Sequence, residues 1–137
     1  MPDHYHAKRH IEFADTDMAG IAHFSRFFVF MEAAEHEFWR SLGLSVHLER
    51  DGDVVSWPRM SASCDYRRAV KFEDELHIHL QIERRGSKTL TYRFDFFKSD
   101  ELIARGQLKT ICCICNPGEP IRSIPIPDFI SEKIEAS

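Results

Sequence analysis

Residues 11–44 read IEFADTDMAGIAHFSRFFVFMEAAEHEFWRSLGL, a short polar loop followed by a long segment rich in aromatic residues. From about Phe24 to Leu42, apolar side chains recur at steps of three and four residues: Phe27, Met31, Ala34, Phe38 and Leu42. This spacing predicts one long helix, and Gly43 is placed to end it in a left-handed cap. Polar residues lie off this stripe: Arg26, Glu32, Glu35, His36 and Arg40. Because further aromatic bulk flanks the stripe, we expect a sheet to wrap around the helix.

The period of the apolar pattern changes to two in the second half of the chain. Apolar residues alternate with polar ones over 76–82 and again over 90–96, with a turn at 85–88 between them. This alternation predicts two neighbouring antiparallel strands. We further expect a first strand over 4–13, a loop over 44–58 and one long final strand over 102–115. A strand, a long helix and then a run of strands predict an α+β domain.

Composition narrows the class of protein. The chain has 137 residues, which fits a single domain spanning 1–137. Its net charge of −4 argues against a nucleic-acid partner, because nucleic-acid binding normally requires a basic surface. No stretch approaches the ~20 apolar residues needed for membrane insertion, and the first ten residues lack the apolar core of a signal peptide.

Three of the four cysteines fall together, at Cys112, Cys113 and Cys115. Such close spacing does not build a disulfide framework, so we expect reduced thiols and a cytoplasmic location. A metal or redox module is an alternative interpretation of this cluster. We favour packed thiols, because zinc sites usually space their cysteines by two to four intervening residues in a loop.

Three blocks of the chain resemble the 4-hydroxybenzoyl-CoA thioesterase family. The first is the Asp-x-Asp-x-x-Gly loop at 15–20, followed by a helix that ends in Leu-Gly-Leu at 42–44. The others are the segment CDYRRAVKFEDEL at 64–76 and the closing NPGEPIRSIP at 116–125. The resemblance covers about residues 7–130. It implies a hotdog fold, in which a curved antiparallel sheet of about five strands wraps a long central helix.

The same resemblance implies an enzyme that hydrolyses acyl-CoA thioesters without a metal or organic cofactor. It also implies a homodimer or homotetramer with the site between subunits. The family's catalytic carboxylate corresponds to Asp17. A carboxylate there can attack the thioester carbonyl or activate water as a general base, and the sequence leaves both routes open. A turn or helix-capping role is the alternative for Asp17, and Asp15 is expected to be structural.

Three further residues complete the predicted catalytic site. The backbone N–H of Phe24 lies at the predicted helix start, where donors without helical partners can stabilise an oxyanion. Gly20 lets the backbone turn and the substrate approach closely. His23 stands where the family usually has an aromatic residue. It could assist proton transfer, although a half-buried substitute for that aromatic residue is the interpretation we favour. Arg26 stands where the family usually has Asn.

The phosphates of CoA call for basic side chains. Arg84, Arg85 and Lys88 flank a predicted strand turn and are the first candidates, the alternative being a solvated turn. A second basic group comprises Arg67, Arg68 and Lys71. The main rival to a thioesterase is a hotdog protein that binds acyl-CoA or acyl carrier protein without turnover. The acyl group itself is not indicated by the sequence.

Overall fold

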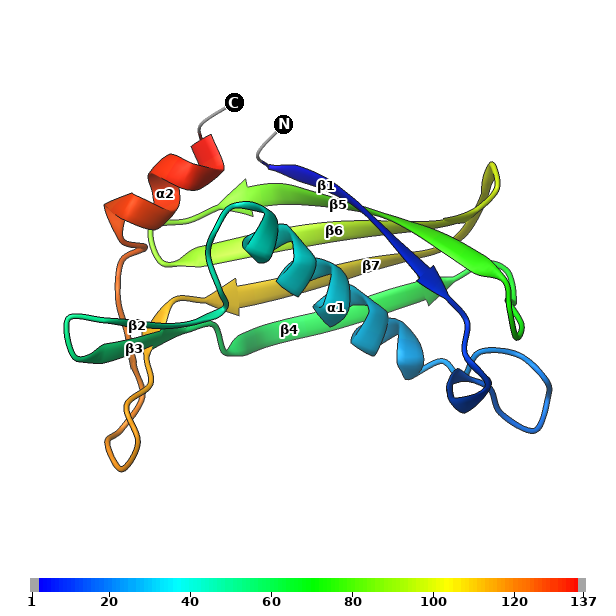
Figure 1. Ribbon diagram of the computed structural model, residues 1–137, viewed down its shortest axis with the longest axis horizontal. Coiled ribbons are helices and arrows are strands. Elements are labelled where there is room, and N and C mark those ends of the chain that lie inside the picture. The colour runs from blue at the N-terminus through cyan, green and yellow to red at the C-terminus, as the bar shows by residue number, and fades with distance from the viewer. Residues whose placement is uncertain (1–2, 136–137) are drawn as a thin grey trace.

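The protein is described by a computed structural model over residues 3–135. Its largest unit is an antiparallel sheet of five strands in the order β1-β5-β6-β7-β4 (Figure 1). These strands are β1 His4–His10, β4 Arg59–Tyr66, β5 Glu75–Arg85, β6 Thr89–Lys98 and β7 Glu101–Ile111. A smaller sheet has the order β2-β3-β8-β9, with β2 His47–Arg50, β3 Asp53–Ser56, β8 Cys113–Ile114 and β9 Arg122–Ser123. The helices are α1 Arg26–Ser41 and α2 Asp128–Glu135, and a single 3-10 turn, η1, spans Phe13–Asp15.

Helix α1 lies across the five-stranded sheet, and the main core forms between them (Figure 1). Leu76, Ile78 and Leu80 of β5 are at most 1% exposed, as the alternating pattern predicted. From the helix side of this core, α1 contributes seven buried residues: Phe27, Phe30, Met31, Ala34, Glu35, Phe38 and Trp39. A Cβ atom at Gly106 of β7 would collide with the Met31 side chain, so glycine at this position lets helix and sheet approach closely. The α+β prediction is therefore confirmed.

Some predicted boundaries were wrong. The helix begins at Arg26 rather than near Phe24, because residues 24 and 25 form a turn that leads into it. The expected loop over 44–58 contains β2 and β3. The expected final strand is interrupted at Cys112, where the chain leaves the large sheet and continues as β8 in the small one.

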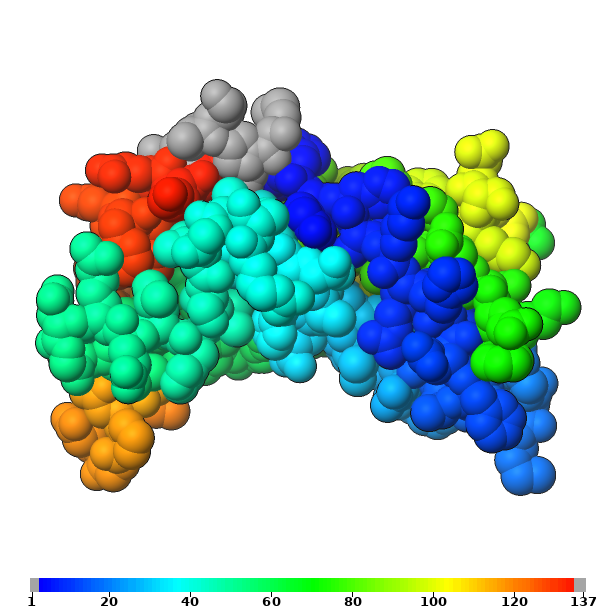
Figure 2. Space-filling model, in the orientation of Figure 1, coloured from blue at the N-terminus to red at the C-terminus, as the bar shows by residue number. Residues whose placement is uncertain are grey.

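The fold carries the predicted site residues to two ends of the molecule. The segment 11–25, which connects β1 to α1, lies at one end of the large sheet, and the β5–β6 turn lies at the other (Figure 1). Between these ends the molecule is arched, and its lower margin in Figure 2 is hollowed. No helix within 3–135 is long and apolar enough to cross a membrane.

Candidate functional site

Asp17 lies in a tight turn on the surface. Its backbone N–H donates to the carbonyl of Ile21 (3.0 Å), and its own carbonyl accepts the N–H of Gly20 (2.9 Å). Gly20 has φ +80°, a left-handed conformation that glycine adopts without strain. The Ala19 N–H donates to Oδ1 of Asp17 (2.9 Å). Within residues 3–135, no donor bonds to Oδ2, so one carboxylate oxygen of this exposed side chain is open.

Asp15, by contrast, is fully buried and joins the two ends of this loop. Its Oδ1 accepts a hydrogen bond from Nε of Arg26 (2.8 Å) and forms ion pairs with Nη2 of Arg26 (2.8 Å) and Nη2 of Arg9 (3.6 Å). Its Oδ2 accepts the N–H of Glu12 (2.8 Å), and its carbonyl accepts the N–H of His23 (2.8 Å). These contacts agree with the structural role expected for Asp15. They also give Arg26 a role, because its guanidinium reaches back from the helix to this carboxylate.

The entry to α1 presents an unused backbone donor. The imidazole Nδ1 of His23 is 2.8 Å from Oγ of Ser25 and accepts the Ser25 N–H at 3.3 Å. In the described part of the chain, the N–H of Phe24 has no acceptor, whereas its carbonyl accepts the Tyr66 hydroxyl at 2.8 Å. The His23 and Phe24 rings lie against each other, with centroids 4.6 Å apart. The structure therefore brings Asp17, Gly20, His23 and Phe24 into one surface segment at the N-terminal end of α1.

The basic residues proposed for CoA phosphates do not join this segment within one chain. Arg84, Arg85 and Lys88 lie at the β5–β6 turn, and the 11 residues of β5 separate that turn from the Asp17 end of the sheet. At ~3.3 Å per residue, the separation is roughly 30–35 Å. The second basic group, by contrast, lies in the 67–71 segment. This segment is bonded to the Asp17 loop through the Ala22 N–H and the Val70 carbonyl (2.7 Å).

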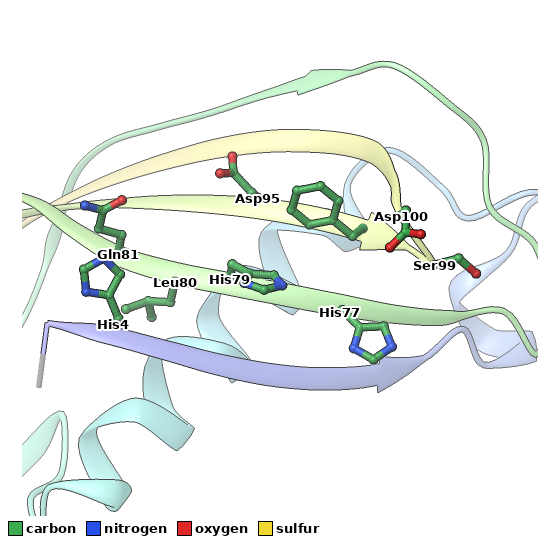
Figure 3. Close-up of a pocket in the computed structure, with 9 residues that line it drawn as sticks. His4, His77, His79, Leu80, Gln81, Asp95, Ser99 and Asp100 are labelled. Atoms are coloured by element: carbon green, nitrogen blue, oxygen red, sulfur yellow. The ribbon is translucent and has the colours of Figure 1, made fainter. Parts of the chain in front are cut away.

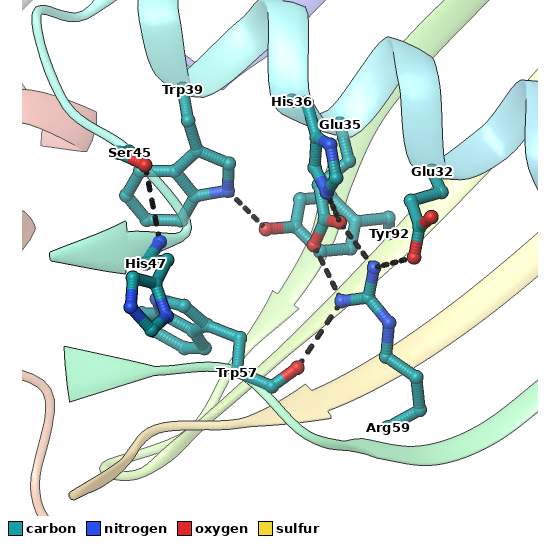
Figure 4. Close-up of polar contacts among 9 residues, drawn as sticks. All are labelled: Glu32, Glu35, His36, Trp39, Ser45, His47, Trp57, Arg59 and Tyr92. Atoms are coloured by element: carbon teal, nitrogen blue, oxygen red, sulfur yellow. Dashed lines mark hydrogen bonds and ion pairs between the residues drawn. The ribbon is translucent and has the colours of Figure 1, made fainter. Parts of the chain in front are cut away.

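An ionic cluster built around a buried carboxylate lies under α1 and was not anticipated from the sequence (Figure 4). Glu35, although off the apolar stripe, is fully buried, and its two carboxylate oxygens accept hydrogen bonds from Arg59 at 2.6 and 3.0 Å. Arg59 also bonds to Glu32 (3.2 Å), and the indole of Trp39 donates to the Tyr92 hydroxyl (3.0 Å). Burial raises the pKa of Glu35 even though Arg59 opposes that change. The sequence signal was weak, because Glu35 is one of several polar residues of the helix and differs only in lying next to Ala34 of the apolar stripe.

A hollow of about 620 Å³ lies elsewhere, on the sheet face opposite the helix (Figure 3). Its lining includes His4 of β1, His77 and His79 of β5 and Asp95 of β6, and none of the predicted site residues. His77 and His79 occupy positions that alternate with the buried apolar residues of β5. Across residues 3–135, no group of three or more His, Cys, Asp or Glu side chains is arranged to hold a metal ion.

Comparison with known proteins identifies the family. Residues 11–134 match the thioesterase-like superfamily. The chain belongs to this family. It is 33% identical over 120 residues to a proposed esterase of Aquifex aeolicus, covering 86% of this chain and 89% of that protein. It is also 28% identical over 134 residues to the 1,4-dihydroxy-2-naphthoyl-CoA hydrolase of Synechococcus sp. (strain CC9605), covering 94% and 88%.

A solved structure supports the same assignment. A hypothetical protein from Aquifex aeolicus aligns with a TM-score of 0.85 at 27% identity, covering 96% of this chain and 99% of that one. The hotdog fold of the thioesterase-like superfamily is therefore confirmed, as is the expectation of a thioesterase.

Proposed function

We propose that the protein hydrolyses an acyl-CoA thioester to a carboxylic acid and free CoA, with Asp17 as nucleophile or general base. One observation carries this proposal. An exposed carboxylate with an open Oδ2 and a backbone N–H without an acceptor occur in the same segment, at Asp17 and Phe24. Thioester hydrolysis needs these two groups, one to attack or activate water and one to stabilise the oxyanion.

The reaction follows from these roles. The thioester carbonyl oxygen accepts the Phe24 N–H, and the N-terminal end of α1 adds its positive dipole as negative charge develops there. In one route, Oδ2 of Asp17 attacks the carbonyl carbon, CoA leaves as a thiolate, and water hydrolyses the mixed anhydride. In the other, Asp17 takes a proton from water, which attacks directly. In either route the water loses one proton overall, and the CoA thiolate takes one up. The carboxyl group of Asp17 or solvent supplies that proton, and because Ser25 engages Nδ1 of His23, only the Nε2 atom of that ring could relay it.

The proposed acyl group is aromatic. Support comes from relatives named as hydrolases of 1,4-dihydroxy-2-naphthoyl-CoA. Support also comes from the Phe24 side chain, which is 63% exposed at the site and offers a ring for stacking.

A second copy of the chain is proposed to complete the site. Strand β4 pairs with β7 on one side, and within 3–135 no strand pairs with its other edge. All its residues but Cys64 are exposed, and β4 is the outermost strand on its side of the sheet (Figure 1). An unpaired edge of this kind is a template for strand addition. Since Arg84, Arg85 and Lys88 lie far from Asp17 in their own chain, we place them against the CoA phosphates of a site on another subunit.

The test is free-thiol release from short-chain, long-chain and aromatic acyl-CoA substrates. Turnover of at least one substrate, with an aromatic one preferred, supports the proposal. Tight binding of acyl-CoA or acyl carrier protein without thiol release would instead establish the non-catalytic alternative. A preference for long aliphatic chains would refute the proposed acyl group alone.

A further inference from the structure

The strand β4 ends at a tyrosine that bonds to the entry of α1. Tyr66 is 43% exposed, and its hydroxyl donates to the Phe24 carbonyl at 2.8 Å. Its ring packs edge-on against Phe27, with centroids 5.2 Å apart. Phe27 in turn packs against the buried rings of Phe30 and Phe96, at 5.5 and 5.2 Å. The phenol is therefore anchored to the core at one side and to the helix entry at the other.

Of the two hydrogen bonds that the Phe24 carbonyl accepts in the described chain, the one from Tyr66 is the shorter. The helical N–H of Phe27 also points to this carbonyl, but at 3.4 Å, near the limit for a hydrogen bond. Elsewhere in the described chain, no other side chain from a separate strand or helix bonds to the backbone of residues 22–25. Without the phenol, a single long bond would hold the carbonyl of Phe24.

The N–H of Phe24, which has no acceptor, and its carbonyl, which is hydrogen-bonded to Tyr66, are attached to the same Cα atom. Fixing the carbonyl restricts rotation about the two backbone dihedrals of Phe24, and so restricts the direction in which its N–H points. We propose that Tyr66 is a positioning residue for hydrolysis, which aims the Phe24 N–H at the developing oxyanion. The inference rests on the proposed thioesterase function and adds to it a residue outside the catalytic loop. The role assigned to Tyr66 acts through the Phe24 backbone and requires no contact of the phenol with the reacting atoms.

The hydroxyl keeps its donor proton over the range of ordinary assays. Partial burial, with the neighbouring Cys64, raises the pKa of Tyr66 to about 12. The contribution of Tyr66 is therefore independent of pH below that value, which separates it from any effect of a titrating base.

The experiment compares Tyr66→Phe with wild type, and uses Tyr5→Phe as a matched control. Tyr5 lies on β1 with its ring 6.3 Å from Phe38, away from the helix entry. We expect Tyr66→Phe to lower kcat by at least about 10-fold, since a misplaced oxyanion donor loses much of its effect. KM and the affinity for a CoA thioether, an analogue without the thioester carbonyl, should stay within about twofold of wild type. The melting temperature should change by no more than a few degrees. The factor in kcat should be the same from pH 6 to 9.

A kcat for Tyr66→Phe within about twofold of wild type would overturn the inference while leaving the thioesterase function intact. A parallel loss of thioether affinity and thermal stability would also overturn it, because the phenol would then support the fold and not the donor. If wild type releases thiol from no acyl-CoA, the proposed function fails first, and the positioning role fails with it.

Discussion

Arg59→Met should strongly destabilise the protein, because it leaves a buried carboxylate without its cation. The Glu35 side chain is 0% exposed, and both of its oxygens bond to the Arg59 guanidinium, which is 30% exposed. Breaking a buried ion pair from one side typically costs about 3–5 kcal/mol. The contact of Arg59 with the exposed Glu32 adds little to this cost.

The stability lost in Arg59→Met should increase as the pH rises. Burial raises the pKa of Glu35 above its ordinary value of 4.5, so the native state holds this proton more tightly than the unfolded chain does. Its contribution to stability is therefore greatest in acid and falls as pH rises through the raised pKa. Removing Arg59 raises that pKa further, so the deficit of the variant should widen from acid to neutral pH.

Urea unfolding, followed at equal protein concentrations at pH 5 and pH 7.5, measures both effects. With an m-value of about 2 kcal/mol/M, the expected loss moves the midpoint down by about 1.5–2.5 M near neutral pH. The double variant Arg59→Met/Glu35→Leu should recover most of it, because an apolar pair of similar volume replaces the ions. A single variant within about 1 kcal/mol of wild type at pH 7.5, or a double variant no more stable than the single one, would refute this reasoning.

Three further predictions concern the site. Gly20→Ala should lower the free energy of unfolding by about 1–2 kcal/mol, because φ +80° is strained for alanine, and a thermal melt measures this loss. It should also lower kcat, which thiol release measures. Arg26→Met should lower the free energy of unfolding by about 1–3 kcal/mol, because it leaves the buried Asp15 carboxylate with weaker partners. A melting temperature no lower than that of wild type would contradict the importance of this pair. Arg85→Ala with Lys88→Ala should raise KM for acyl-CoA by about 10-fold at unchanged kcat, whereas an unchanged KM would move the phosphate contacts to the 67–71 group.

Much of the fold could be predicted because its signals are local. Strands β5 and β6 were identified by apolar residues that alternate along the chain, and α1 by apolar residues at steps of three and four. Both patterns involve only residues that are close together in the sequence. Strands β2 and β3 have four residues each, and β3 is completed by pairing with β8 more than fifty residues later. No local pattern reports such a pairing. The same limit explains the break at Cys112, where the chain changes partners rather than composition.

The candidate site was predictable in its loop but not in its supports. The sequence places Asp17 and Gly20 together in one loop before the helix, because these residues are near neighbours in the chain; their catalytic roles stay predictions. One contact that holds it comes from afar, since Tyr66 bonds to Phe24 across 42 positions. The ion pair of Arg59 with Glu35, which lies apart from this loop, spans 24 positions and was hidden from the sequence for the same reason. Arg26 gave a weak signal as a departure from the family pattern, but its partner, Asp15, emerged only from the folded chain.

The most direct measurement is kcat for Asp17→Asn on the substrate that wild type turns over best, with Asp100→Asn as a control. Asp100 is an exposed aspartate on the β6–β7 turn, and within 3–135 it makes no hydrogen bond or ion pair with the 11–25 segment. Asparagine keeps the shape of the side chain and removes the charge, so the account predicts a kcat at least ~100-fold below wild type for Asp17→Asn and wild-type activity for Asp100→Asn. An Asp17→Asn variant that hydrolyses acyl-CoA as fast as wild type would contradict the assignment of Asp17 as the catalytic carboxylate.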